Sequence, residues 1–180
     1  MSTSGRIAMI ALLTVALTGV TSRGGSGQDR GGGAAPRADG PQETQVVAAY
    51  VDPGTQSPVV ILRGMRDKRT FPMSIGPAEL GAIAITLNGV TPPRPLTHDL
   101  FLTLFGRFNV KLTRVVITDL RDDVYYATLH LTNGTGEITL DSRPSDAIAL
   151  AIRAKVPVFV ESRVFDKAGK SPAPPARPHI

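Results

Sequence analysis

The segment Asp141–Val160 constrains the possible fold most, because it combines a polar start, an apolar middle and a strand-like end. Six consecutive apolar residues, 147–152, are typical of a helix that is buried on nearly every side. Pro144 fits the first turn of such a helix, where its missing N–H is no loss and its fixed φ is already helical. Residues 156–160 are β-branched and aromatic, which favours a strand. The segment therefore predicts a buried helix that leads into a strand.

The polar start of this segment allows two interpretations. In the first, Ser142 or Ser145 caps the helix, and Asp146 lies in the first turn, where the helix dipole stabilises a negative charge. In the second, Arg143, Ser145 and Asp146 bind a ligand at the rim of the core. The first interpretation predicts a structural helix start, and the second predicts a functional site.

The composition of this 180-residue chain favours one folded domain with accessory segments. The absence of cysteine excludes a disulfide framework, a thiolate zinc site and a cysteine nucleophile. The formal net charge is +5, but Val46–Lys167 has 14 lysines and arginines against 12 aspartates and glutamates, a net charge of +2. A folded part so close to neutral is weak support for non-specific binding to nucleic acid.

The two ends of the chain have compositions that differ from a folded domain. Arg6 precedes the apolar run Ile7–Val20, and small residues follow, an order typical of a secretory signal peptide over residues 1–22. The run is shorter than the roughly 18 residues of a membrane-spanning helix; an uncleaved anchor or a wrongly assigned start codon are the alternatives. Residues 23–43 predict a flexible Gly-rich linker, and residues 169–180 predict a Pro-rich disordered tail. We therefore expect an exported protein, periplasmic or secreted, with no stable membrane span after processing.

Residues 44–168 predict a single compact α+β domain, with a mixed β-sheet of about six or seven strands and three helices. Pro157 is compatible with a strand only near the strand's start or at a sheet edge, because it has no N–H to donate. The expected strands are 45–51, 58–63, 70–75, 110–119, 124–131, 137–141 and 156–161. The expected helices are 77–87, 98–106 and 144–154.

Four motifs follow one another along this domain, namely Ser74–Glu79, Arg94–Leu100, Val116–Asp122 and Asp141–Ala147. Together they resemble the bifunctional nuclease family of bacteria and plants, over essentially the whole folded part. The resemblance implies a compact α+β domain that often self-associates, with hydrolysis of both DNA and RNA in some members. It implies no agreed set of catalytic residues. Some members also carry a C-terminal helical module of the kind found in excision-repair proteins, where this chain has its Pro-rich tail, and an exported start is unlike a cytoplasmic repair role.

Phosphodiester hydrolysis needs an activated water, neutralisation of the phosphate charge and a proton for the leaving oxygen. Aspartates near element ends could hold a divalent ion such as Mg²⁺ or Mn²⁺ or activate water, and Arg121 and Arg143 could bind the substrate phosphate bidentately. His98 suits proton transfer, because the unperturbed pKa of histidine is about 6.5. The candidate catalytic residues are Asp119, Arg121, Arg143, Ser145, Asp146, His98 and Asp99.

These candidates also have structural explanations. The helix dipole alone explains a first-turn acid, at about 0.3–1 kcal/mol each, and this applies to Glu79, Asp99 and Asp146. Arg143 could form an ion pair with Asp141 or Asp146, and residues 119–123 could be a solvated turn. His130 is expected at the surface of a strand, and His179 lies in the tail.

Several other site types find no support in the sequence. Three histidines without metal-ligand spacing argue against a zinc hydrolase. No Gly-rich loop joins a strand to a helix, which excludes a nucleotide-binding loop of that type. No Gly-x-Ser-x-Gly turn occurs, so an esterase triad has no support. The aromatic residues are spaced as core or edge residues rather than as an exposed platform for single-stranded nucleic acid.

The leading hypothesis is an exported nuclease that hydrolyses DNA and/or RNA with little sequence specificity. One alternative is a non-catalytic module of the same fold that binds a ligand or partner. Another is an oligomeric scaffold that buries the polar motifs between subunits, and the resemblance itself favours a homo-oligomer. For the nuclease hypothesis we expect Asp119, Arg121, Arg143 and Asp146 to open onto one cleft.

Overall fold

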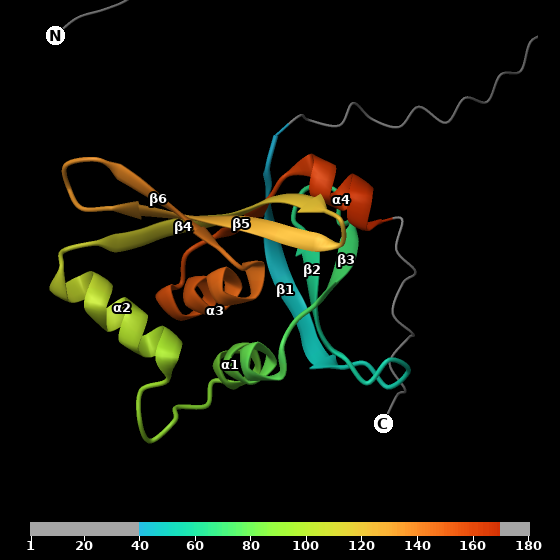
Figure 1. Ribbon diagram of the computed structural model, residues 1–180, viewed down its shortest axis with the longest axis horizontal. Coiled ribbons are helices and arrows are strands. Elements are labelled where there is room, and N and C mark those ends of the chain that lie inside the picture. Colours follow the sequence, from blue (N-terminus) through green and yellow to red (C-terminus); the bar gives the residue numbers. More distant parts are fainter. Residues whose placement is uncertain (1–39, 170–180) are drawn as a thin grey trace, which may run out of the picture. The chain divides into compact units, whose positions relative to one another are not determined.

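A single seven-stranded mixed sheet forms the centre of the computed structural model, which describes residues 40–169 (Figure 1). The strand order is β3-β2-β1-β7-β4-β5-β6, and every neighbouring pair is antiparallel except β4 and β7. The strands are β1 (Gln42–Val51), β2 (Pro58–Gly64), β3 (Thr70–Ser74), β4 (Lys111–Arg121), β5 (Val124–Thr132), β6 (Glu137–Ser142) and β7 (Val158–Val160). The helices are α1 (Pro77–Leu87), α2 (Thr97–Arg107), α3 (Pro144–Ala154) and α4 (Ser162–Ala168).

The α+β prediction is confirmed, with four helices where three were expected. Within the described residues, no helix is long and apolar enough to cross a membrane. The predicted signal peptide, most of the predicted linker and nearly all of the predicted tail lie outside those residues.

Helix α3 is the buried helix that its apolar run predicted. Five consecutive residues, 147–151, are buried, and the helix packs against β4 and β5 while α1 and α2 pack against it (Figure 1). Its N-cap is Arg143, and no side chain makes a capping hydrogen bond there, so the expected cap by Ser142 or Ser145 is wrong. The Ser142 hydroxyl instead donates to the carbonyl of Arg143 over 3.1 Å. Pro144 pre-sets the first turn, which lessens the need for a side-chain cap.

Strand β7 joins the two halves of the sheet although it contains only three residues. It pairs antiparallel with β1, for example Gln42 with Val160, and parallel with β4, for example Val115 with Val158. Pro157 lies just before β7, where its missing N–H costs no ladder bond and its carbonyl accepts from the Val115 N–H over 3.1 Å. A proline can therefore precede a central strand, provided that the strand starts after it.

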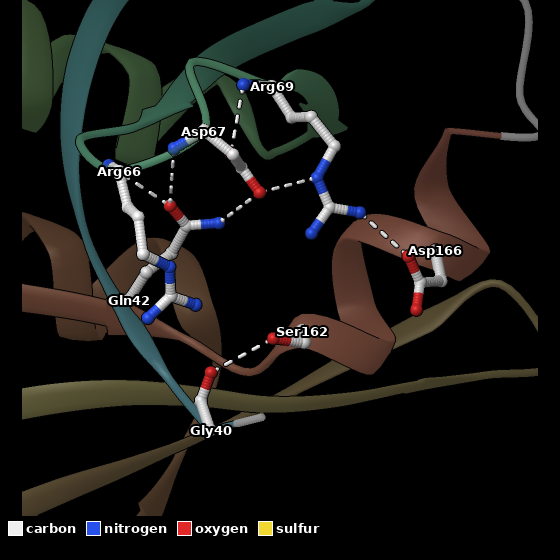
Figure 2. Close-up of polar contacts among 7 residues, drawn as sticks. All are labelled: Gly40, Gln42, Arg66, Asp67, Arg69, Ser162 and Asp166. Atoms are coloured by element: carbon white, nitrogen blue, oxygen red, sulfur yellow. Dashed lines mark hydrogen bonds and ion pairs between the residues drawn. The ribbon is translucent and has the colours of Figure 1, made fainter. Parts of the chain in front are cut away.

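Helix α4 was not expected, because seven residues with few apolar positions give almost no periodic signal and a helix so short is unstable alone. Tertiary contacts stabilise it. Val164, Phe165 and Ala168 are buried. The guanidinium of Arg69, in the turn between β2 and β3, lies 4.8 Å from the centre of the Phe165 ring and pairs with Asp166 over 2.7 Å (Figure 2).

Asp119, at the end of β4, also holds α4 through the neighbouring residue Lys167. The Lys167 ammonium donates to one carboxylate oxygen of Asp119 over 2.7 Å, and the Arg121 Nε donates to the other over 2.7 Å. Lys167 also donates to the carbonyl of Leu120 over 2.9 Å. The hydrogen bonds from Lys167 and then from Arg121 hold the pKa of Asp119 well below its ordinary value. Asp119 thus ties α4 to the sheet.

We expect Asp119→Asn to lower the free energy of unfolding at neutral pH and to do so much less in acid. A carboxylate whose pKa is depressed by folding stabilises the protein above its unfolded pKa, ordinarily 3.8, and loses that contribution as the pH falls toward the folded value. Urea unfolding at pH 7 and at about pH 2, closer to the folded-state pKa, measures the difference. Asp122→Asn in the adjacent turn is the matched control, since asparagine suits its left-handed backbone, φ 47°. An equal loss at both pH values would contradict this role of Asp119.

Candidate active site

A groove of about 930 Å³ opens where the first turns of α1, α2 and α3 meet the end of β6. Its apolar wall comes mainly from α1, α2 and the strands, and its polar residues gather at the helix starts. The charged or titratable residues that line it are Glu79, His98, Asp141, Arg143 and Asp146.

The local sequences explain why these side chains meet. Helix α1 starts with Pro77 and has Glu79 two residues later, and α3 starts with Pro144 and has Asp146 two residues later. A proline at a helix start and an acid in the first turn both stabilise the helix beginning. Since α1 packs against α3, the two acids lie on the same side of the groove.

Arg143 joins these two acids. Its Nε donates to Asp146 Oδ2 over 2.6 Å and its Nη2 donates to Glu79 Oε1 over 2.6 Å. The hydrogen bonds to Asp146 and then to Glu79 raise the pKa of Arg143 above its ordinary value. The side chain remains 67% exposed. Two of its three nitrogens are held by carboxylates, which fixes the orientation of the guanidinium and leaves Nη1 to donate to a phosphate oxygen.

His98 reaches the same acid from α2. Its Nε2 lies 3.2 Å from Asp146 Oδ1, so Asp146 uses one oxygen for His98 and the other for Arg143. The His98 side chain is only 12% exposed. In the tautomer that has its proton on Nε2, the imidazole donates to Asp146 and keeps the Nδ1 lone pair available to accept a proton. Asp146 can therefore orient a general base.

Asp99 has a structural role. One of its oxygens accepts from the Leu96 N–H over 2.8 Å at the start of α2, and the other accepts from Arg153 Nε over 3.0 Å. Asp99 thus caps α2 and ties it to α3, and it does not line the groove. Arg153, which the sequence analysis did not single out, is its partner 54 residues away.

The expected convergence of all four residues on one cleft needs correction. Arg143 and Asp146 line the groove, whereas Asp119 and Arg121 do not and are instead paired with Lys167 of α4. Ser145 is buried in α3 and does not line the groove either. Charged residues at element ends look alike in sequence, and the partner that decides their location is distant.

His130 also lies outside the groove. It is partly buried on β5, and its Nδ1 contacts Glu137 of β6 and Arg114 of β4. The hydrogen bond with His130 keeps the pKa of Glu137 below its ordinary value, against the opposing effect of desolvation. His130 thus lies at the strand surface as expected, and its partly buried side chain belongs to a cross-strand ion cluster.

The residue that the sequence analysis undervalued is Glu79. Its helix-start position had a sufficient structural explanation, yet the structure brings it to Arg143. The sequence does contain a signal for this role of Glu79. Glu79 follows Pro77 at the same spacing at which Asp146 follows Pro144. Two helices that begin in the same way can present their first turns to the same site.

A preformed metal site does not fit this arrangement. Within residues 40–169, no group of three or more histidine or acidic side chains is placed to hold a metal ion. The carboxylates of Glu79 and Asp146 are both bonded to Arg143, whose positive charge already lies between them. The chemistry that the groove residues can perform is phosphate binding by Arg143 and proton transfer by His98.

Comparisons with known proteins identify the family of this chain. The bifunctional nuclease domain matches residues 60–173. An uncharacterized protein of Mycobacterium tuberculosis is 40% identical over 127 residues, which is 71% of this chain and 76% of that protein. Bifunctional nuclease 1 of Oryza sativa subsp. japonica is 36% identical over 81 residues, 43% of this chain but only 24% of the plant protein. Bifunctional nuclease 2 of the same plant is 29% identical over 125 residues, 67% of this chain and 38% of that protein. The match over most of the folded part establishes that this chain belongs to the bifunctional nuclease domain family.

Proposed function

We propose that this protein is an exported nuclease that hydrolyses phosphodiester bonds of DNA and/or RNA with little sequence specificity, and that cleavage takes place in the groove. The observation that supports this most is the meeting of Arg143, Asp146 and His98 at one end of the groove, from two helices far apart in sequence. Membership of the bifunctional nuclease domain family supports the substrate class.

Each of the three residues has a role in the proposed reaction. Arg143 Nη1 binds a non-bridging phosphate oxygen and stabilises the charge that develops there. His98 accepts a proton from the attacking water, and Asp146 holds the imidazole in the required orientation and stabilises the imidazolium. The phosphorus–oxygen bond opposite the attacking water breaks, and the leaving oxygen takes its proton from solvent in the open groove. Glu79 keeps Arg143 in place from α1.

The proposed low specificity follows from the groove's apolar wall. That wall includes Leu100, Phe101 and Leu140, whose side chains offer neither donors nor acceptors to read base edges. Such a wall accepts any base by contact.

Arg143→Ala should lower kcat/KM on plasmid DNA and on RNA by about 10²–10³-fold, the usual effect of removing one charge-stabilising donor. Arg143→Lys should have a kcat/KM between those of the wild-type protein and Arg143→Ala. Lysine keeps the positive charge but lacks the planar guanidinium that binds two carboxylates and a phosphate. Each variant is assayed with Mg²⁺, with Mn²⁺ and with chelator, after circular dichroism confirms folding. Asp119→Ala is the control outside the groove and should retain activity.

Three outcomes would contradict this assignment. Equal activity of Arg143→Ala and the wild-type protein would show that cleavage does not take place in the groove. Loss of activity in Asp119→Ala but not in Arg143→Ala would show that the catalytic residues lie at the end of β4. No hydrolysis in any of the three conditions favours the non-catalytic binding module.

The proposal of export is based on the sequence of residues 1–22. It predicts that a signal peptidase removes these residues. Expression in a bacterial host should yield a periplasmic or secreted protein whose N-terminus, measured by intact mass, follows Ser22. A full-length protein retained in the cytoplasm would show that the segment is not a signal peptide. Replacing two residues of the apolar run, Leu12→Arg and Leu13→Arg, should abolish export while residues 40–169 are unchanged.

We also propose that the protein self-associates through α2 and the edge strand β6. Helix α2 exposes Leu104, and Phe108 at its end is 73% exposed; neither residue lines the groove. Phe101 and Phe108 are exposed, whereas the spacing of the aromatic residues predicts core or edge positions. Strand β6 is the last strand of the sheet and exposes Ile138 outside the groove. Apolar surface and an unpaired strand edge are features that a second copy commonly covers.

The double variant Leu104→Lys/Phe108→Lys should be monomeric by size-exclusion chromatography with light scattering, whereas the wild-type protein should be an oligomer. Neither residue lines the groove, so cleavage of short substrates should persist. Val51→Lys, a half-exposed apolar residue on β1, is the control and should remain oligomeric. A monomeric wild-type protein at micromolar concentration would contradict self-association.

A further inference from the structure

Asp141 differs from the other two acids that line the groove, because its charge has no partner. Glu79 and Asp146 are both bonded to Arg143, and Asp146 also contacts His98. Asp141 lies near the end of β6 and is exposed, and its side chain makes no hydrogen bond or ion pair with residues 40–169. Its negative charge is therefore presented to the groove uncompensated.

The polar end of the groove has more carboxylates than cations. Among the described residues, Glu79, Asp141 and Asp146 line the groove together with a single lysine or arginine, which is Arg143. Arg94, in the loop before α2, is exposed and does not line the groove. Even if Arg94 is counted, three carboxylates stand against two cations. One phosphate can accept from Arg143, but a second phosphate in the described groove meets no further cation.

The other cations close to the groove-lining segments do not change this balance. The side chain of Arg153 is 7% exposed and is paired with Asp99. Arg107 is the last residue of α2, nine residues after His98, which is about 13 Å along a helix axis. That separation exceeds the Debye length of about 8 Å at physiological salt. Neither cation therefore offsets the charge of Asp141.

The size and the apolar wall of the groove suit a short substrate. Its volume of about 930 Å³ lies in the range of pockets that enclose a small molecule. Leu100, Phe101 and Leu140 offer apolar surface on which bases can pack. A fragment with two bases and one phosphodiester can place its single charge on Arg143 and its bases on this wall.

A longer strand brings a second phosphate close to Asp141. Neighbouring phosphates of one strand are about 3.4 Å apart along the axis of B-DNA, well within a Debye length of about 8 Å. A phosphate next to the one that Arg143 binds is therefore repelled by the groove carboxylates, and Asp141 has its full charge available for this. A repulsive group placed against one class of ligand is a general source of specificity.

We propose that Asp141 is a specificity-determining residue that disfavours a second phosphate, so that the groove prefers a dinucleotide-sized fragment with one phosphodiester over a longer strand. This inference rests on the proposed nuclease function and names the substrate class that the groove selects. Selection by number of phosphates does not depend on the bases, which agrees with low sequence specificity.

Terminal phosphates test this preference, because each adds charge to a dinucleotide without adding a base. We compare kcat/KM of the purified chain for the thymidine dinucleotide and for its 5′-phosphorylated and 3′-phosphorylated forms, at about 20 and about 300 mM salt. At least one phosphorylated form should have a kcat/KM about three- to tenfold lower at the low salt. Screening should reduce that difference to within about twofold at the high salt.

Substitutions of Asp141 test whether this residue causes the preference. Asp141→Asn should remove the preference, whereas Asp141→Glu should keep it, because glutamate restores the negative charge. Asparagine has nearly the size of aspartate, and Asp141 makes no side-chain bond within residues 40–169, so the fold should be unchanged. Asp122→Asn is the matched control, since Asp122 is an exposed acid outside the groove, and it should keep the wild-type preference.

Binding of the same three dinucleotides, measured by calorimetry, separates this inference from the proposed function. A preference in binding that Asp141→Asn removes, when even the wild-type protein hydrolyses nothing, supports the role of Asp141 and overturns the nuclease. Equal kcat/KM for the three dinucleotides at low salt supports the nuclease and overturns the role of Asp141. An equal loss of preference in Asp141→Asn and Asp122→Asn also overturns that role. Absence of both binding and hydrolysis overturns both proposals.

Discussion

The burial of α3 is the constraint on which the rest of this fold depends. Its apolar middle can be removed from water only if other elements cover it on nearly all sides, and β4, β5, α1 and α2 provide that cover. The first turn of α3 then emerges at the rim of the core, where Arg143 and Asp146 meet residues of α1 and α2. The end of α3 leads within four residues to β7, which joins the two halves of the sheet. One buried helix thus positions both the groove and the sheet junction.

The sequence predicts elements well where the local signal and the tertiary structure agree. The bounds of α3 are those expected, because a proline start, a buried apolar run and a left-handed residue at Lys155 all mark the same segment. It predicts poorly where stability comes from distant residues. Helix α4 depends on Arg69 and Asp119, which are 97 and 48 residues from their partners in the helix. Strand β7 lies within the expected strand 156–161, but only residues 158–160 form it, because its pairing with β1 and β4 sets its length.

The residues of the candidate site were likewise predictable where the local sequence marks their position, and not where a distant partner decides it. Arg143, Asp146 and His98 could be anticipated because each lies at a helix start beside a proline-containing segment, and the helix starts do meet. Asp119 and Arg121 were grouped with them because charge near an element end was the criterion. Nothing local in their sequence distinguishes a groove acid from an acid that anchors Lys167. Their separation in space is decided by which helix packs against the end of β4.

The groove combines one fixed cation with an excess of carboxylates. Held between two carboxylates, the Arg143 guanidinium stays oriented and protonated, but the groove has no excess positive charge to draw a polyanion from solution. Under the proposed function, the substrate is therefore held by contact with the apolar wall and by one oriented guanidinium rather than by long-range attraction.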